Sequence, residues 1–285
     1  MKKSFQKSKQ RREDGKAYKH DLGQHFLYDE NLLRTLVAGT GVTPQDGVLE
    51  IGPGSGALTS CLCDAARHVL AVEADSGLLP FLRIKLATYP NITIIEGDIR
   101  KQPLEELCLP LGKDFFVIAN IPYNITTPIL DLLWHSRLPI RQASVMVQKE
   151  VADKLLASPS DDAYGLLSVK CAYYCEPALV ALVPAEAFTP PPKVDSAFIN
   201  LPFRKEPPLP VQNETLLFSL IKAGFGMRRK TLANAVKGVL PLPTADVHAI
   251  LQQLHFSPFI RGEALSIEDW IRFANACHEH KRCLR

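Results

Sequence analysis

The sequence predicts an α/β domain with a mostly parallel sheet and an antiparallel edge, followed by a small all-helical domain. Apolar, strand-like runs alternate with helix-like stretches between residues 47 and 157. A strand without a crossover helix follows near residue 196, and apolar residues recur at helical spacing from about Asn213 onward. A chain of 285 residues is long enough for one large domain and one small one.

Five apolar runs form the expected parallel part of the sheet. They are apolar at almost every position, as strands buried on both faces are, and helix-like stretches separate them. The expected strands are 48–52, 68–72, 92–95, 115–119 and 143–147, and the expected helices begin near 57 or cover 76–89, 128–135 and 149–157.

The pattern changes after Ser158. Residues 166–174 and 179–183 fit either a strand or a helix, whereas Ser196–Phe203 alternates and predicts the antiparallel edge strand. Ser266 and Asp269 resemble a capping box at a helix start. We therefore expect a basic tail over 1–20, an α/β domain over 21–203, a proline-rich linker over 204–212 and a helical domain over 213–285.

The composition favours a globular protein of the cytoplasm. Hydrophobic residues make up 46%, and no run of eighteen apolar residues predicts a membrane span. The N-terminus lacks the apolar segment of a secretory signal. The seven cysteines form no CxxC pair and have no matching histidine pattern, which predicts reduced, mostly buried thiols and no metal site.

The first 19 residues are strongly basic, with eight lysines and arginines against Glu13 and Asp14. Such a segment cannot bury apolar surface, so we expect it to be disordered when free. It either solubilises the protein or binds a polyanion, and charge alone leaves both interpretations open.

A glycine-rich loop follows the first expected strand and opens a helix. Its sequence is Gly52-Pro-Gly54-Ser-Gly56-Ala57. Glycines permit positive φ and close approach of a ligand, and the helix N-terminus adds a positive dipole end. The loop predicts a nucleoside cofactor, with a tight packing turn as the alternative.

Two acidic residues end the next two expected strands. Glu73 lies 21 residues beyond Gly52, where a carboxylate can accept hydrogen bonds from the hydroxyls of a ribose. This pair fits NAD and S-adenosylmethionine equally, because both carry an adenosine ribose. Asp98 follows the third strand and either accepts from the adenine amine of the cofactor or caps a helix.

The turn Asn120-Ile121-Pro122-Tyr123 after the fourth strand indicates the chemistry. The exocyclic amine of adenine is a poor nucleophile because its lone pair is delocalised into the ring. The Asn120 side-chain oxygen and the Ile121 carbonyl can accept its two hydrogens, and Pro122 keeps Ile121 extended. Tyr123 offers a ring on which an extruded base can stack, worth about 1–3 kcal/mol. No general base is needed, since the methylated amine can lose its proton to water.

Several motifs in the same order resemble the bacterial small-subunit ribosomal RNA adenine dimethyltransferases of the KsgA type. The resemblance covers nearly the whole chain from about Leu22. The matching stretches are Leu22–Leu27, Leu49–Gly54, Ala71–Asp75, Ala119–Asn124, Val147–Val151, Tyr164–Ser168, Phe188–Ser196 and Phe225–Thr231.

The resemblance implies a Rossmann-like class I methyltransferase with a seven-stranded sheet and S-adenosylmethionine as cofactor. It implies a cofactor site made of residues His25, Leu27, Gly52, Gly54, Glu73, Asp98 and Asn120. The family often has asparagine where this chain has His25.

The resemblance also implies the substrate, namely the N6 amines of two adjacent adenosines in the 3′-terminal hairpin loop of 16S rRNA. The partner would be an immature small ribosomal subunit, bound by a monomer. Phe188 would stack on the target base opposite Tyr123, and the loop ending at Lys193 would lie near it. The basic run of Arg228, Arg229 and Lys230 is expected to contact phosphates.

Three other functions compete with this interpretation. A 23S rRNA adenine dimethyltransferase of the macrolide-resistance type shares the glycine loop and the Asn-x-Pro-Tyr turn. A non-catalytic RNA-binding assembly factor could keep the fold, although the intact Glu73, Asp98, Asn120 and Tyr123 argue against it. An NAD enzyme would share the glycine loop but has no need for the Asn120 turn.

Overall fold

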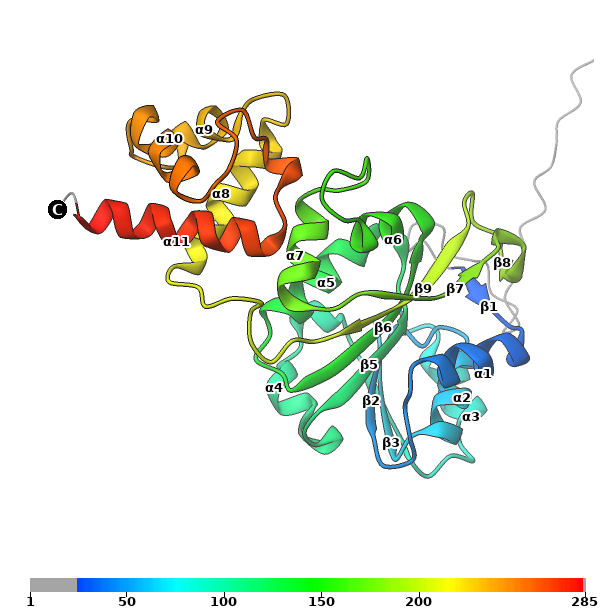
Figure 1. The fold of residues 1–285 in the computed structure, drawn as a ribbon. Coiled ribbons are helices and arrows are strands. Elements are labelled where there is room, and N and C mark those ends of the chain that lie inside the picture. The colour runs from blue at the N-terminus through cyan, green and yellow to red at the C-terminus, as the bar shows by residue number, and fades with distance from the viewer. Residues whose placement is uncertain (1–24, 284–285) are drawn as a thin grey trace, which may run out of the picture. The chain divides into compact units, whose positions relative to one another are not determined.

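The computed structural model describes residues 25–283 and contains one seven-stranded sheet with the order β4-β3-β2-β5-β6-β9-β7 (Figure 1). The first five of these strands pair in parallel, and β9 is antiparallel to both β6 and β7. This arrangement confirms the predicted parallel sheet with an antiparallel edge. The strands are β2 (Gly47–Ile51), β3 (His68–Glu73), β4 (Ile92–Glu96), β5 (Phe115–Asn120), β6 (Ile140–Gln148), β7 (Ala178–Val183) and β9 (Ser196–Pro202).

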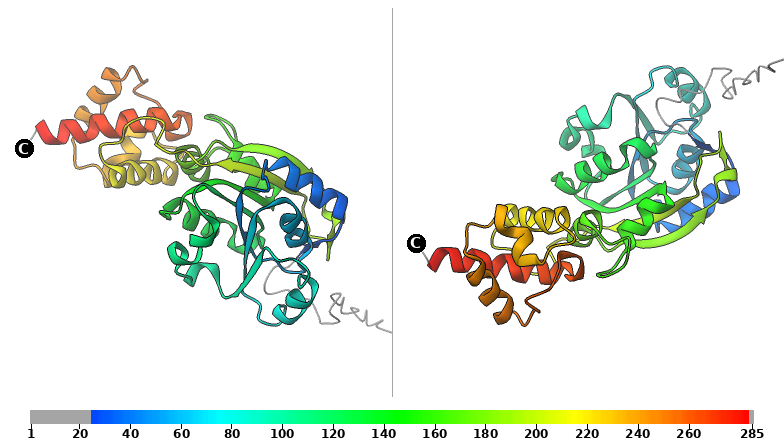
Figure 2. Two further views of the ribbon diagram at one scale, coloured as in Figure 1. Left: turned by 90° about the horizontal axis from the view of Figure 1, so that it is seen from below. Right: turned by 90° about the horizontal axis from the view of Figure 1, so that it is seen from above.

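Helices cover both faces of this sheet (Figure 1). One apolar cluster joins α1 (Glu30–Gly39) and α2 (Ala57–Ala65) to side chains of β2, β3, β5, β6 and β9. Figure 2 shows α1, in dark blue, running along the antiparallel edge. The other helices of this part are α3 (Leu79–Lys85), α4 (Leu104–Leu107), α5 (Thr126–His135) and α6 (Lys149–Leu156).

Helix α3 is shorter than the expected 76–89 because prolines bound it. Pro80 lies in its first turn, where proline is tolerated, so the helix cannot begin much earlier. Pro90 disfavours helical backbone at Tyr89, and the chain leaves the helix after Lys85.

A two-stranded antiparallel ribbon was not predicted. It pairs β1 (Phe26–Leu27) with β8 (Phe188–Thr189). Two residues per strand are too few for a periodicity to be read from sequence. The ribbon holds the start of the described chain against the loop before β9.

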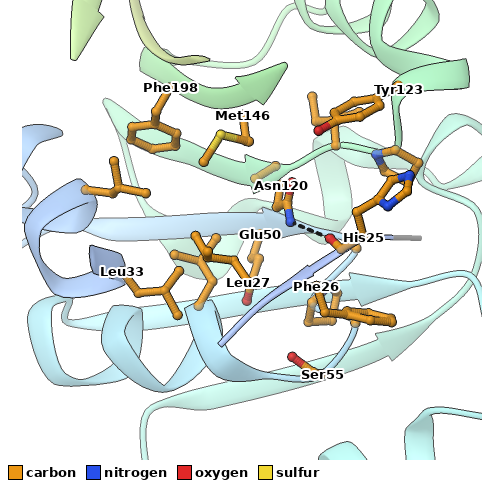
Figure 3. Close-up of a pocket in the computed structure, with 18 of the residues that line it drawn as sticks. His25, Phe26, Leu27, Leu33, Glu50, Ser55, Asn120, Tyr123, Met146 and Phe198 are labelled. Atoms are coloured by element: carbon orange, nitrogen blue, oxygen red, sulfur yellow. Dashed lines mark hydrogen bonds between the residues drawn. The ribbon is translucent and has the colours of Figure 1, made fainter. Parts of the chain in front are cut away.

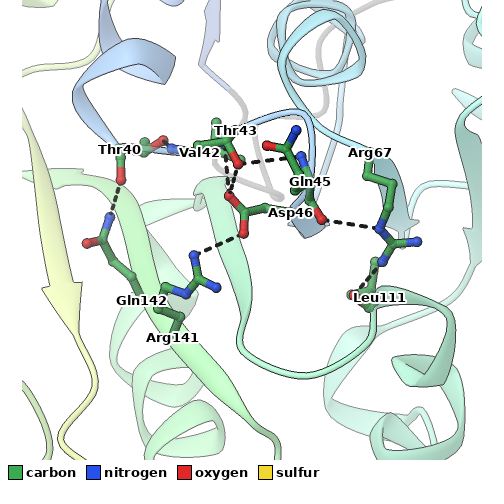
Figure 4. A network of polar contacts seen from close by, with 9 residues as sticks. All are labelled: Thr40, Val42, Thr43, Gln45, Asp46, Arg67, Leu111, Arg141 and Gln142. Carbon is green, nitrogen blue, oxygen red and sulfur yellow. Dashed lines mark hydrogen bonds and ion pairs between the residues drawn. The ribbon is translucent and has the colours of Figure 1, made fainter.

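Polar contacts at the amino ends of the strands fix the turn that leads into β2 (Figure 4). The buried Asp46 carboxylate accepts from the backbone and hydroxyl of Thr43 and forms an ion pair of 2.9 Å with Arg141 of β6. Arg67, before β3, donates to the carbonyls of Gln45 and Leu111. These contacts bind three inter-strand loops together at the sheet edge where the parallel strands begin.

The remaining part of the chain is helical. The ambiguous segment 166–174 forms helix α7 (Leu166–Tyr174), whereas 179–183 belongs to strand β7. Helices α8 (Glu214–Gly226), α9 (Leu232–Ala235), α10 (Thr244–Gln253) and α11 (Ile267–Cys283) follow the linker and are yellow to red in Figure 2. Ser266 and Asp269 form the expected reciprocal capping hydrogen bonds, each 3.1 Å long. Short 3-10 turns are η2 (Ile99–Lys101), η3 (Leu109–Leu111), η4 (Tyr123–Ile125), η5 (Ala185–Ala187), η6 (Val236–Gly238) and η7 (Gly262–Ala264).

The chain divides into two compact units whose boundary differs from the expected one. Among the described residues, the α/β unit contains 25–152 and Ala178–Pro202, and the helical unit contains Asp153–Pro177 and 203–283. The segment around α7 joins the helical unit because its apolar side chains complete that unit's core: Tyr164, Val169 and Tyr173 are buried with residues of α8 and α11. The expected basic tail lies outside the described residues.

Two expectations from composition concern the described residues. Between residues 25 and 283, no helix has the length and apolarity needed to cross a membrane. Six cysteines of the described residues are reduced and buried, as predicted: Cys61, Cys63, Cys108, Cys171, Cys175 and Cys277.

A close helix contact in the helical unit gives a first prediction. A Cβ added to Gly224 of α8 would lie 2.5 Å from the buried Trp270 ring, whereas a Cβ on Gly226 meets nothing within 4 Å. We expect Gly224→Ala to lower the free energy of unfolding by about 1–3 kcal/mol through overpacking. The matched control Gly226→Ala should be neutral or stabilising by up to about 1 kcal/mol. Urea unfolding followed by tryptophan fluorescence measures both, and equal effects would contradict the proposed contact.

Candidate active site

A cleft opens where β2 and β5 end, and it collects most of the residues that the sequence singled out. Its walls come from the loop after β2, the turn after β5, and the segment that contains β1 (Figure 3). Met146 of β6 and Phe198 of β9 supply apolar surface. The predicted residues that line it are His25, Leu27, Gly52, Gly54, Glu73, Asn120, Ile121, Pro122 and Tyr123.

The glycine loop has the backbone conformation that its sequence predicts. Gly52, Gly54 and Gly56 have φ values of 71°, 58° and 72°, which side chains other than glycine rarely adopt. A Cβ on Gly54 would lie 2.6 Å from the Phe26 ring, whereas the space beside Gly52 is open. The loop therefore presents bare backbone to the cleft and ends at the first turn of α2.

Glu73 supports this loop from the end of β3. One of its carboxylate oxygens accepts from the Gly54 amide at 3.0 Å, and the other accepts from the Asp75 amide at 2.7 Å. Burial raises the pKa of the Glu73 carboxyl, and these two amide hydrogen bonds oppose that shift. Each oxygen keeps a second lone pair, so the carboxylate can still accept a hydrogen bond from a ligand hydroxyl.

Glu50 is a cleft residue that the sequence reasoning missed. It lies in β2, its side chain is 1% exposed, and its Oε2 has no hydrogen-bond partner within residues 25–283. Burial raises the pKa of Glu50 to about 8, against the effect of the Thr59 hydroxyl, and the nearby Glu73 raises it further. The available signal was an acidic residue inside the otherwise apolar run Val48–Ile51.

The Asn120 side chain is oriented by a backbone contact. Its Nδ2 donates to the carbonyl of His25 at 3.1 Å (Figure 3). A carbonyl can only accept, so the amide nitrogen faces His25 and Oδ1 is the end left to accept from a ligand. The side chain of the next residue, Ile121, is buried in the wall of the cleft.

The Tyr123 ring is held at its edge and at one face. Its hydroxyl lies 2.6 Å from the Ser196 hydroxyl, and its ring stacks on His25 with centroids 5.6 Å apart and an interplanar angle of 25°. Burial raises the pKa of the Tyr123 hydroxyl, while the Ser196 hydrogen bond opposes the shift. The tyrosine is therefore neutral and positioned before any ligand binds.

His25 connects this ring to the loop before β9. Its Nδ1 lies 2.7 Å from the carbonyl of Pro190. Because the carbonyl only accepts, Nδ1 carries the hydrogen. His25 therefore contacts Pro190 through its ring nitrogen, Tyr123 through its ring face and Asn120 through its carbonyl.

Asp98 lies outside the lining of the cleft. Its carboxylate caps η2 and forms an ion pair of 2.7 Å with Arg100. The hydrogen bond from Arg100 lowers the pKa of the Asp98 carboxyl. The structure thus shows the helix cap, the alternative that the sequence left open, and a contact with the cofactor adenine stays a prediction.

Phe188 departs from its expected role. Its side chain is 2% exposed and packs in the apolar cluster beneath α1, so in this conformation the ring has no face for a base. Pairing of β8 with β1 draws it inward. Lys193, in the loop after β8, is exposed.

The basic run of the helical unit lies between α8 and α9. Arg229 and Lys230 are exposed. Arg228 donates to the Glu263 carboxylate at 3.3 Å and to the Tyr164 carbonyl at 3.1 Å. Arg228 is thus partly a structural residue of this unit, while its two neighbours extend into solvent.

Known proteins have sequences similar to nearly the whole of this chain. A family model described as ribosomal RNA adenine dimethylase matches residues 15–275. The chain is 42% identical to the ribosomal RNA small subunit methyltransferase A of Lachnoclostridium phytofermentans over 92% of each chain. It is also 42% identical to the protein of that name from Bacillus mycoides over 94% of each chain.

Two solved structures have the same fold over about nine-tenths of this chain. A dimethyladenosine transferase from Plasmodium falciparum superposes with a TM-score of 0.78 and 26% identity, covering 90% of this chain and 98% of the other. The 23S rRNA methyltransferase ErmE superposes with a TM-score of 0.70 and 28% identity, covering 89% of this chain and 99% of the other.

These similarities decide between the cofactor classes that the glycine loop left open. The family model extends over both units, and the relatives match end to end with methyltransferase names, so the NAD enzyme is wrong. The class I methyltransferase fold and the rRNA adenine dimethyltransferase activity expected from the motifs are confirmed. The chain belongs to the ribosomal RNA adenine dimethylase family.

Proposed function

We propose that this chain transfers methyl groups from S-adenosylmethionine to the N6 amines of two adjacent adenosines in the 3′-terminal hairpin loop of 16S rRNA. It acts as a monomer in the cytoplasm on an immature small ribosomal subunit. One observation carries the proposal: the Asn120 amide, with its oxygen available, lines the same cleft as the bare glycine loop and Glu73.

The residues of the cleft fit an adenosine cofactor that carries a positive charge. The loop from Gly52 to Gly54 leaves open backbone for close approach, and Glu73 has lone pairs for the ribose hydroxyls. Within residues 25–283, Oε2 of the buried Glu50 has no hydrogen-bond partner, which favours a cationic ligand nearby. When bound, S-adenosylmethionine supplies an electrophilic methyl group on a sulfonium.

The turn after β5 supports attack by an adenine amine. Oδ1 of Asn120 accepts one amine hydrogen and the Ile121 carbonyl a second, which draws electron density toward the nitrogen. The Tyr123 ring provides the stacking surface that holds the extruded base. Alignment and oriented acceptors then account for the rate enhancement, and the proton leaves to water.

The small subunit is preferred over 23S rRNA as the substrate because of the relatives. The relatives that are 42% identical over at least 92% of the chain are named for the small subunit, whereas the 23S rRNA methyltransferase ErmE is 28% identical. Mapping dimethyladenosine in rRNA from a deletion strain tests this choice, and loss of the modification in 23S rather than 16S would reverse it.

The exposed ends of the basic run suit RNA phosphates. Arg229 and Lys230 extend into solvent, and phosphate contacts contribute affinity that does not depend on sequence. Shape and the accessibility of a loop base then select the target.

Replacement of Asn120 tests the proposed acceptor. We expect Asn120→Ala to fold, to bind S-adenosylmethionine within a few-fold of the parent, and to lose methyl transfer by at least about 100-fold, as when an oxyanion-hole donor is removed. Asn31→Ala, an exposed asparagine of α1, is the matched control and should retain full activity. Transfer is measured with tritiated cofactor and immature small subunits, followed by nucleoside mapping. Full activity of Asn120→Ala would refute the mechanism.

Glu50 predicts a pH dependence of stability. The pKa of Glu50 rises from 4.5 to about 8 on folding. Its contribution to the stability of the protein is therefore complete below pH 4.5 and is lost as the pH rises through about 8. Between these two pH values, the free energy of unfolding should fall by on the order of 1.4 kcal/mol per pH unit. We expect the stability of Glu50→Gln relative to the parent to increase across the window and to level off above it. Urea unfolding between pH 5 and pH 9 measures this difference.

The exposed Glu105→Gln serves as the control for Glu50→Gln and should parallel the parent at every pH. A constant difference between Glu50→Gln and the parent across the whole range would show that the Glu50 carboxyl is ionised in the folded protein.

The salt dependence of RNA binding tests the basic run. Arg229→Ala should weaken binding to immature subunits and reduce the slope of log K against log salt by about 1, because one phosphate contact is lost. Lys222→Ala removes an exposed cation from α8 and should leave the slope unchanged. Filter binding at several salt concentrations gives both slopes, and equal slopes for Arg229→Ala and the parent would remove Arg229 from the RNA contact.

A further inference from the structure

Ser196 is buried at the edge of the cleft without a role in the chemistry described above. It is the first residue of β9, its exposed fraction is 0%, and its hydroxyl lies 2.6 Å from the hydroxyl of Tyr123. It is the one side chain of the described residues that hydrogen-bonds to the Tyr123 hydroxyl. A buried serine hydroxyl at this distance makes a short, well-formed hydrogen bond.

The antiparallel edge of the sheet explains why Ser196 reaches this position. Strand β9 pairs antiparallel with β6, and Ser196 lies opposite Gln148, the last residue of β6. An antiparallel strand begins where its parallel neighbours end, so the start of β9 lies at the same sheet edge as the turn after β5. Ser196 also pairs with Val183 of β7, which fixes its backbone from the other side.

The contacts of Tyr123 are of different kinds and restrain different motions. The His25 ring packs against one face of the tyrosine, which limits tilting of the ring. Stacking alone does not fix how far the ring slides over its partner, because offset stacks are favourable over centroid distances of about 4.5–7 Å. The Ser196 hydrogen bond fixes the hydroxyl end and so removes that remaining freedom.

We propose that Ser196 is a positioning residue that holds the Tyr123 ring in register with Asn120, so that a stacked adenine presents its amine to the Asn120 oxygen. This inference rests on the proposed function, because it gives Tyr123 the role of the stacking surface. Ser196 does not line the cleft, so it acts through the tyrosine hydroxyl.

The second methyl transfer should depend most on this restraint. After the first transfer, the amine carries one methyl group and one hydrogen, so one acceptor contact to the base is lost. The orientation of the base then depends more on stacking than it did before. If the Tyr123 ring has more freedom, the enzyme should therefore release more monomethyladenosine.

A double-mutant cycle tests the proposal. We expect Ser196→Ala and Tyr123→Phe each to lower kcat by roughly three- to tenfold, in line with loss of one hydrogen bond. Both should raise the ratio of monomethyladenosine to dimethyladenosine and leave the Kd for S-adenosylmethionine unchanged. The double variant should be no slower than the slower single variant, because both changes remove the same hydrogen bond.

The matched control is Ser144→Ala. Ser144 of β6 is also 0% exposed and donates a hydrogen bond of 2.7 Å, in its case to Asn200, but it does not line the cleft. It should lose a similar amount of stability while keeping the kcat and the product ratio of the parent. A change in the product ratio of this control would show that any buried serine loss has the same effect, and would overturn the proposal.

A measurement without substrate separates this inference from the proposed function. In protein with 13Cζ-labelled tyrosine, Ser196→Ala should shift the Tyr123 resonance, because the hydroxyl loses its hydrogen-bond partner, and should broaden it, because the ring takes up more positions. Ser144→Ala should do neither. An unchanged Tyr123 resonance in Ser196→Ala, or kcat losses that multiply in the double variant, would overturn the role of Ser196. If the parent enzyme fails to dimethylate adenosine although the resonance responds as expected, the proposed function fails and the restraint on Tyr123 remains.

Discussion

The parallel pairing of β2 with β3 and β5 is the constraint on which the cleft depends. Parallel strands end at the same edge of a sheet, so the glycine loop, Glu73 and Asn120 arrive side by side although they lie up to 68 residues apart in sequence. The apolar side chains of these strands are buried on both faces, and a slip of one residue would move each of them to the opposite face. The core that stabilises the fold therefore also sets the relative heights of the glycine loop and the Asn120 turn.

The segment around His25 orients a side chain of the cleft that the parallel strands bring into place. The β1–β8 ribbon fixes the backbone of the segment, and the His25 carbonyl then sets which end of the Asn120 amide is available. Without that contact the amide could present its nitrogen, which cannot accept from an amine. A residue outside the Asn-Ile-Pro-Tyr turn thus determines whether the turn has the polarity that the proposed chemistry needs.

The sequence predicted the parts of the fold that repeat a periodic pattern, and it failed where a contact between distant segments decides. The five parallel strands follow from apolar runs, and the glycine loop follows from three glycines whose φ values are positive. The ribbon that buries Phe188 is too short to carry a pattern, and the transfer of 153–177 to the helical unit depends on a core shared with α8. Glu50 was missed because it resembles an ordinary strand residue until its burial is known.

Two buried carboxyl groups determine which ligand charge the cleft favours. Glu73 and Glu50 are each at most 5% exposed, and each is costly to ionise in an apolar setting. Glu73 reduces that cost with two backbone amides, whereas Glu50 has no such donor for its Oε2 within residues 25–283 and takes up a proton more readily. A neutral or anionic ligand would leave this imbalance in place, but a ligand with a positive centre stabilises the ionised form of both groups. The acidic pair thus favours a cationic cofactor, and this argument does not depend on the motifs. It agrees with the family to which the chain belongs.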